Sequence, residues 1–338
     1  MALMYKRISF FILSIFALLF MSTVNYDSQQ SINKQLSAGS IFGLPSFLLS
    51  EPVAPITKAF NFSPAEMRAE VEASFPSLRS LKNLTFENQL ERKLNTNPLW
   101  RSLIRNKRMS VGVVDMSDKE DVRFATVNGQ HMMYAASLPK IAVLAAAHDA
   151  IERGELKESA VVKADMRLMI AKSNNAATTR MIDRIGFDKI ERTMTDPDLK
   201  LYDPAFGGGL WVGKRYAAGG NRNPDPMKGI SHAATTEQIC RYFYLLANDQ
   251  LISEKSSAKM RSYLVDPQLH HKFVNVLDQV APDAKVYRKS GSWSTFHADV
   301  ALVQGPNRNY IITALVDDPK GEQICRDLAK VLDSMLVD

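Results

Sequence analysis

The chain has 338 residues, with 42 Lys and Arg against 36 Asp and Glu, 46% hydrophobic residues and two cysteines. This length suffices for one large domain or two of moderate size, each with a real core. The composition excludes a wholly disordered chain, a low-complexity fibre, a disulfide framework and a four-thiolate zinc site. The net charge of +6 is too diffuse to indicate a nucleic-acid partner.

The amino terminus carries an uncharged, strongly apolar run over residues 8–24, which follows Lys6 and Arg7. A basic start before such a run is typical of a signal peptide or a signal anchor. We therefore assign residues 1–25 to export and expect a periplasmic or other extracytoplasmic location. Cleavage of this segment and membrane anchoring through residues 8–24 both stay open. Residues 26–80, rich in Ser and Pro, are expected to form a linker or N-terminal extension.

Residues 81–338 are expected to form one domain with strands near both of its ends. The predicted elements, in chain order, are helices over 83–106 with a break at Pro98, strands at 109–116 and 122–127, helices over about 138–264, strands at 285–288, 297–303 and 310–316, and a helix at 322–336. This order predicts an α+β fold: an antiparallel five-stranded sheet built from both ends of the chain and flanked by helices, with an inserted all-helical lobe. Within that lobe, residues 200–229 are expected to form a long irregular loop.

Cys240 and Cys325 lie in separate helix-like stretches, so the sequence favours two separately buried thiols over a disulfide. The six histidines show no spacing typical of a metal site, and we assign neither a metal nor a cofactor. No pattern in the sequence fixes the oligomeric state.

Ser137 and Lys140 are three residues apart at the predicted start of a helix over residues 138–152. Pro139 suits the first turn, where its missing N–H costs nothing, and the Ser hydroxyl would lie near free backbone N–H groups at the positive end of the dipole. Lys140 lies one turn on along the same face, within reach of the Ser oxygen. A neutral Lys amine is a workable base for a Ser nucleophile. Taken alone, so short a pattern is more often an ordinary helix cap followed by a surface lysine.

Ser173 and Asn175 follow a helix-like run over residues 165–172. A second hydroxyl near Lys140 would relay a proton to a leaving group, and Asn175 would hydrogen-bond a substrate amide. A capping or turn cluster is the alternative, since Ser and Asn favour both.

Lys289, Ser290, Gly291 and Ser292 are expected to begin a strand near the carboxyl end. The lysine, helped by the Ser290 hydroxyl, would hold an anionic carboxylate. Gly291 would let a substrate backbone approach the strand edge, and the Ser292 N–H would be one oxyanion donor beside the Ser137 N–H.

The three motifs in this order resemble those of the penicillin-recognising serine hydrolases, the superfamily of class A β-lactamases and D,D-peptidases. That superfamily has Ser-x-x-Lys at a helix start, Ser-Asp-Asn on a helical lobe and Lys-Thr/Ser-Gly on a strand. The resemblance extends over about residues 83–338. The roles it implies are an acylated nucleophile at Ser137, its base partner at Lys140, a proton shuttle at Ser173, a substrate contact at Asn175 and a carboxylate clamp at Lys289 with Ser290.

The chain also departs from the class A pattern. Asn174 replaces the Asp of the middle motif, and Trp293 stands where many β-lactamases carry Gly. The class A enzymes place a Glu on a loop to activate the deacylating water, but residues 192–236 contain no Glu. Four aspartates are possible substitutes: Asp196, Asp198, Asp203 and Asp225.

The resemblance therefore implies a serine hydrolase that opens β-lactam rings through an acyl-enzyme. The missing Glu favours two alternatives. One is a D,D-peptidase or penicillin-binding protein that acts on cell-wall peptide of the D-Ala-D-Ala type and deacylates slowly. The other is a sensor that binds β-lactams or peptidoglycan without turnover.

Overall fold

The computed structural model describes residues 76–337, which lie within one compact unit of the chain. The apolar run over 8–24 and all but the end of the 26–80 extension lie outside the described residues. Their predicted roles, and the domain boundary at residue 81, therefore stay predictions. Across residues 76–337 no helix has the length and apolar character needed to cross a membrane.

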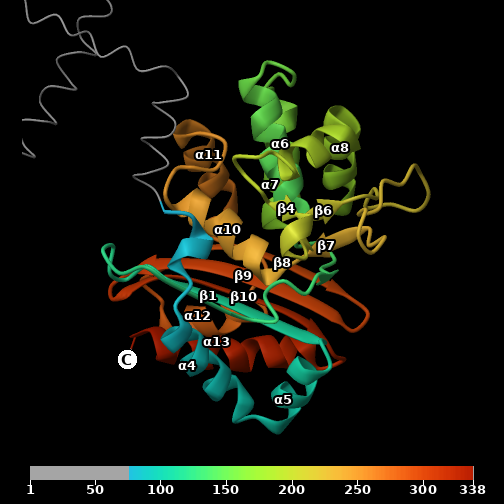
Figure 1. Cartoon of the computed structure of the whole chain (residues 1–338). Helices are drawn as coiled ribbons and strands as arrows, with labels where there is room; N and C mark the ends of the chain where they lie inside the picture. Colours follow the sequence, from blue (N-terminus) through green and yellow to red (C-terminus); the bar gives the residue numbers. More distant parts are fainter. Residues whose placement is uncertain (1–75, 338) are drawn as a thin grey trace, which may run out of the picture. The chain divides into compact units, whose positions relative to one another are not determined.

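Five antiparallel strands form the central sheet, in the spatial order β2-β1-β10-β9-β8 (Figure 1). Their bounds are β1 Met109–Asp115, β2 Arg123–Val127, β8 Lys285–Trp293, β9 Phe296–Gly305 and β10 Arg308–Asp317. Strands β1 and β10 come from opposite ends of the described chain and pair along the whole of β1, with Met109 opposite Val316. The sheet built from both ends of the chain is thus confirmed.

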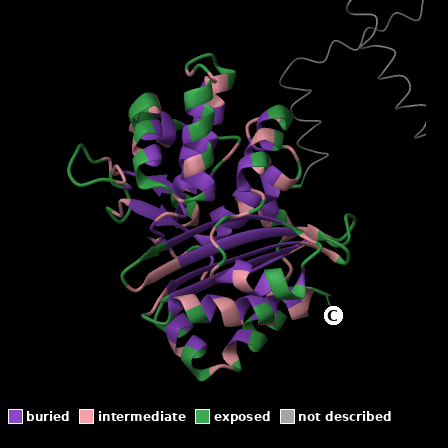
Figure 2. Cartoon of the chain, turned by 180° about the vertical axis from the view of Figure 1, so that it is seen from behind, coloured by how far each residue is buried: buried purple, intermediate pink, exposed green. Residues whose placement is uncertain are grey.

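Side-chain alternation along the strands divides the hydrophobic core into two layers. On β1, Val111 and Val113 face one cluster and Val114 faces the other, as the two-residue period of a strand requires. Because helices cover both faces, the middle of the sheet is buried throughout (Figure 2). Cys240 and Cys325 belong to opposite layers and are free, buried thiols, which confirms the prediction that they do not pair.

The terminal helices cover one face of the sheet (Figure 1). They are α4 Leu84–Asn95, α5 Pro98–Arg105, α12 Phe273–Val280 and α13 Gly321–Val337. Asn83 and Asn97 cap α4 and α5 by accepting backbone N–H bonds, so the predicted break at Pro98 separates two helices. A 3-10 helix at Leu78–Leu81 precedes α4.

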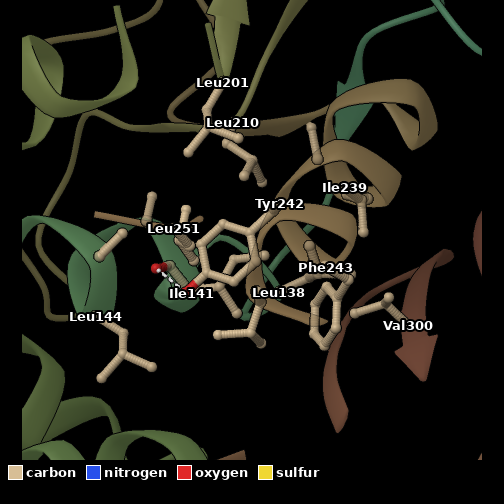
Figure 3. Packing of buried hydrophobic residues seen from close by; sticks show 14 of the residues in the cluster. Leu138, Ile141, Leu144, Leu201, Leu210, Ile239, Tyr242, Phe243, Leu251 and Val300 are labelled. Carbon is tan, nitrogen blue, oxygen red and sulfur yellow. Dashed lines mark hydrogen bonds between the residues drawn. The ribbon is translucent and has the colours of Figure 1, made fainter. Parts of the chain in front are cut away.

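The inserted lobe lies on the other face, where α10 packs against β1 and β10. Its helices are α6 Lys140–Glu152, α7 Ala160–Ala171, α8 Asn175–Ile185, α9 Phe187–Met194, α10 Thr236–Ala247 and α11 Glu254–Leu264. Helix α6 runs through the middle of the lobe, and its residues 140–148 are all buried. Tyr242 of α10 donates a hydrogen bond to the Ile141 carbonyl at 3.1 Å within this core (Figure 3).

The lobe is helical but also holds short strands that sequence periodicity did not reveal. They are β3 Met133–Tyr134, β4 Tyr202–Asp203, β5 Gly208–Gly209, β6 Trp211–Val212 and β7 His232–Ala234, with a 3-10 helix at Pro204–Phe206. Pairing of β4 with β5 and of β6 with β7 satisfies backbone groups in the stretch predicted to be irregular. Segments of two or three residues are too short to show a period, so only tertiary pairing identifies them.

Two predicted boundaries are corrected next to the motifs. Helix α6 begins at Lys140 rather than Leu138, because residues 136–139 form a turn in which the Leu138 N–H bonds the Ala135 carbonyl at 3.0 Å. Strand β8 runs without interruption from Lys285 to Trp293, so the lysine motif lies in its second half instead of beginning a new strand.

Candidate active site

Ser137 lies in the turn that joins β3 to α6, and it is half-buried. The preceding Ala136 has φ +52°, a left-handed conformation that is uncommon for a residue with a Cβ. The turn is fixed on one side by the Ala135 N–H, which donates to the His232 carbonyl of β7 at 2.8 Å. Strained backbone of this kind clusters at functional sites, where surrounding structure holds it in place.

The Lys140 amine is buried beneath this turn and bonds three acceptors on the α7–α8 connection. Its Nζ donates to the Ser173 carbonyl at 2.5 Å, to Asn175 Oδ1 at 2.8 Å and to Ser173 Oγ at 3.3 Å. Burial lowers the pKa of Lys140 to about 7, so near neutral pH a large part of the amine is unprotonated. Within residues 76–337 its hydrogen bonds go to these acceptors and not to Ser137 Oγ, so the expected direct contact between the two motif residues is not formed.

Ser173 and Asn175 reach the site because the chain turns sharply between α7 and α8. Ser173 has φ +53°, and Asn174 caps α8 by accepting the Ala177 N–H at 2.8 Å. Asp and Asn are comparable caps, so an Asn in the middle motif keeps the local structure that an Asp would give. The departure at Asn174 therefore leaves Ser173 and Asn175 in position.

Lys289 approaches Ser173 from the sheet, opposite Lys140. Its buried Nζ donates to Ser173 Oγ at 2.9 Å and to the Ser290 carbonyl at 2.8 Å. Burial, with the nearby Lys140 cation second, holds the pKa of Lys289 well below its usual range. The Ser173 hydroxyl thus lies between two lysine amines, one from each lobe. Ser290 is buried beside them, whereas Ser292 further along β8 is exposed.

Gly291 brings β8 against the Ser137 turn. A Cβ added at Gly291 would lie 2.2 Å from the Ala135 carbonyl oxygen and 2.6 Å from the Ser137 nitrogen. Real Cβ atoms do not approach backbone this closely, so only glycine permits the contact. Gly291 therefore lets the second half of β8 lie directly against the Ser137 turn, and the oxyanion site at the Ser137 and Ser292 N–H groups stays a prediction.

The loop carboxylates considered as substitutes for the missing Glu have structural partners. Buried Asp225 accepts the Tyr202 hydroxyl at 3.0 Å and the Ile230 N–H at 2.5 Å, which ties the loop together. Asp203 pairs with Arg79 at 3.1 Å, and Asp196 accepts the Asp198 N–H at 2.9 Å.

Among residues 76–337, no group of three or more His, Cys, Asp or Glu side chains could hold a metal ion.

Two residues beside the site were not found from the sequence. The Tyr216 ring centre lies 4.6 Å from Lys140 Nζ, and its hydroxyl donates to the Ala136 carbonyl at 3.1 Å. Lys272 is fully buried under β8, and its Nζ donates to the Gly291 carbonyl at 2.5 Å and to the Ala298 carbonyl at 3.1 Å. Neither residue belongs to a spaced motif, and only the fold brings them to the site.

Comparisons with known proteins agree with this architecture. A model of the beta-lactamase enzyme family matches residues 101–167 and 162–335, which is more than half of the chain. A search of curated proteins gives no significant match. Fold and motifs place the chain among the penicillin-recognising serine hydrolases, and within them it belongs to the beta-lactamase enzyme family.

Solved structures of low sequence identity share the fold. A beta-lactamase from Sphaerobacter thermophilus is 18% identical, with a TM-score of 0.55, and the match covers 68% of this chain and 91% of that one. PBP-A is 16% identical, with a TM-score of 0.54 and coverage of 75% and 96%. The TLA-3 extended-spectrum beta-lactamase is 14% identical, with a TM-score of 0.55 and coverage of 73% and 99%. At these identities the likeness is one of fold alone.

The capping role of Asn174 can be tested by its effect on stability. We expect Asn174→Ala to lower the free energy of unfolding by about 1 kcal/mol, the usual cost of a lost N-cap. Asn174→Asp is the matched control and should stay within about 0.5 kcal/mol of the unchanged protein, because its carboxylate also accepts the Ala177 N–H. Urea unfolding monitored by circular dichroism measures both. Equal losses for Ala and Asp would contradict the capping role.

Proposed function

We propose that this protein is a serine hydrolase that opens the amide bond of β-lactam rings through an acyl-enzyme on Ser137. The observation that carries the proposal is the convergence of two buried lysine amines on Ser173 Oγ beside the Ser137 turn. One amine comes from the helical lobe and one from the sheet, so the arrangement exists only when both lobes are folded. Its substrates would be met outside the cytoplasm, the location for which the apolar run over 8–24 is typical.

In the acylation step, Ser137 Oγ attacks the ring carbonyl carbon and its proton passes to the neutral Lys140 amine. A rotation of the lysine or serine side chain brings the two together from the resting arrangement. The oxyanion that forms is held by the Ser137 and Ser292 N–H groups. The ring C–N bond then breaks, the nitrogen takes the Ser173 hydroxyl proton, and Lys140 returns its proton to Ser173, which lies 3.3 Å from Nζ.

Substrate recognition in this proposal uses the positive charge and the polar rim of the site. The Lys289 amine contacts Ser173 Oγ and the Ser290 carbonyl, so a substrate carboxylate bound at these residues would lie near this amine and favour its protonated form. Asn175 is exposed at the rim, where its amide could bond a substrate amide. Penicillins and D-Ala-D-Ala peptides both carry a carboxylate next to the reacting amide, which fits this polarity.

The nucleophile can be identified by covalent labelling with a fluorescent penicillin. We expect Ser137→Ala to abolish labelling while the circular dichroism spectrum and melting temperature stay unchanged, because the side chain is half-buried and packs little. Lys140→Ala should also suppress labelling, since it removes the base. Ser292→Ala is the matched control: it keeps its backbone N–H and should label normally. An adduct of normal stoichiometry on Ser137→Ala would refute the assignment.

The pH dependence of acylation follows from the lowered pKa of Lys140, about 7. The base acts unprotonated, so the acylation rate should rise with pH and level off above this pKa. One and a half pH units below it, only a few per cent of the amine is neutral, which predicts a rate about 30-fold below the plateau. Stopped-flow labelling between about pH 5.5 and pH 9 measures this, with melting temperature as the control for folding. A rate independent of pH across this range would contradict Lys140 as the base.

A second candidate function is a D,D-peptidase or penicillin-binding protein that deacylates slowly. The observation that favours it is the loop between α9 and β7, which carries no Glu and whose Asp196, Asp203 and Asp225 are held by other groups. Deacylation requires a water on the acyl carbonyl and a group that takes its proton. Without that group the acyl-enzyme persists, and the reaction with a β-lactam becomes inhibition.

Turnover distinguishes the two candidates. A positioned general base contributes about 10²–10⁴-fold to such a step, so its absence predicts a burst of about one equivalent of product followed by a slow steady state. Penicillin hydrolysis followed by absorbance, with intact-mass detection of the adduct, measures both phases. Rapid hydrolysis without a burst would overturn slow deacylation. Asp198→Asn and Asp203→Asn would then show whether either carboxylate supplies the base.

A further inference from the structure

Two side chains bond the carbonyl oxygens of the two peptide groups whose N–H groups are the proposed oxyanion donors. The Tyr216 hydroxyl donates to the Ala136 carbonyl at 3.1 Å, and the next atom of that peptide group is the Ser137 nitrogen. The Lys272 amine donates to the Gly291 carbonyl at 2.5 Å, and that peptide group ends in the Ser292 nitrogen. Each peptide group whose N–H is a predicted oxyanion donor therefore also accepts a side-chain hydrogen bond at its carbonyl oxygen.

This arrangement has a direct electronic consequence. A hydrogen bond to a peptide oxygen draws electron density through the conjugated C–N bond and leaves the N–H more positive. Chains of hydrogen bonds strengthen one another in this way by roughly 10–30% per bond. A more positive N–H binds the oxyanion of the tetrahedral intermediate more strongly, and this interaction is among the largest contributions to acyl transfer.

The surroundings of the two side chains fit a role at the site. Lys272 is fully buried, and its two hydrogen bonds go to main-chain carbonyls of β8 and β9, while the carboxylate of neighbouring Asp299 is bonded by Arg288 at 2.7 Å. Burying a cation on neutral oxygens is costly, so the residue is a poor choice for stability alone. Burial raises the pKa of Tyr216 well above its usual value, so its hydroxyl keeps its proton and remains a donor.

We propose that Lys272 and Tyr216 are positioning residues that polarise the two peptide groups of the oxyanion hole from behind. Neither touches the substrate: each acts through one peptide bond, Lys272 on the Ser292 N–H and Tyr216 on the Ser137 N–H. The inference rests on the proposed acyl-enzyme chemistry at Ser137 and deepens it, because it assigns what sets the strength of the oxyanion site.

The test compares Tyr216→Phe and Lys272→Met with the unchanged protein. The infrared stretching frequency of the acyl carbonyl is recorded in the acyl-enzyme formed with a penicillin that is ¹³C-labelled at the ring carbonyl. Weaker hydrogen bonds to this oxygen raise the frequency, so both variants should shift upward. If an oxyanion donor is worth 10²–10³ in rate and loses about a fifth of its strength, acylation by Tyr216→Phe should slow about threefold. Lys272→Met removes a charged donor and should slow acylation about tenfold.

Tyr242→Phe is the matched control. The Tyr242 hydroxyl of α10 donates to the Ile141 carbonyl of α6, also at 3.1 Å, but both residues lie within the hydrophobic core of the lobe (Figure 3). Its loss should lower the melting temperature as a buried hydrogen bond does and leave carbonyl frequency and acylation rate unchanged. If Tyr216 or Lys272 had only a structural role, its variant would likewise show a lower melting temperature with an unchanged carbonyl frequency and acylation rate.

The outcomes separate the inference from the function on which it rests. An unchanged protein that forms no acyl-enzyme refutes the proposed function itself. An acyl-enzyme whose carbonyl frequency is the same in both variants and the unchanged protein overturns the polarising role, as does an equal shift in Tyr242→Phe. A shift in only one variant removes the other residue from the assignment. If Lys272→Met fails to fold, Tyr216→Phe decides.

Discussion

The burial of two lysine amines against one serine hydroxyl is the constraint on which the rest of this site depends. Lys140 and Lys289 would repel each other if both were charged, and each has lost most of its hydration. Hydrogen bonds to oxygen acceptors offset the lost hydration of the two amines. The acceptors are the Ser173 hydroxyl and carbonyl, the Asn175 amide and the Ser290 carbonyl. Burial still lowers the pKa of Lys140 to about 7, which under the proposed function would let the amine act as a base near neutral pH.

This cluster exists only at the contact between the two lobes. Lys140 and Ser173 belong to the inserted helices, while Lys289 belongs to the sheet edge, and Gly291 sets how closely the two approach. On the sheet's other face, α4, α5, α12 and α13 bury a second apolar cluster, and buried Asp333 of α13 accepts the Tyr310 hydroxyl of β10 there. The split architecture is thus the means by which residues more than a hundred positions apart meet at one hydroxyl.

The loop between α9 and β7 is held by hydrogen bonds and ion pairs of its own side chains. Its aspartates are used to shape the loop: Asp225 gathers backbone N–H groups and Asp203 holds Arg79. The Tyr216 ring of the same loop faces Lys140. Under the proposed function, acylation would use residues of the three motifs, whereas deacylation would have no carboxylate committed to it among Asp196, Asp203 and Asp225.

Much of this was determined by the sequence itself. Runs rich in β-forming residues near both ends, the turn signals between them and the helix-like middle segment predicted the five-stranded sheet and the inserted lobe. The three motifs also predicted the residues that meet at the site. Only the tertiary structure decided that Lys140 bonds Ser173 and Asn175 rather than Ser137. It also decided that α6 begins at Lys140. Finally, it placed Tyr216 on the Ala136 carbonyl and Lys272 on the Gly291 carbonyl. Hydrogen-bond partners of a long, buried side chain depend on acceptors supplied by distant segments, and no local period or spacing encodes which acceptor lies nearest.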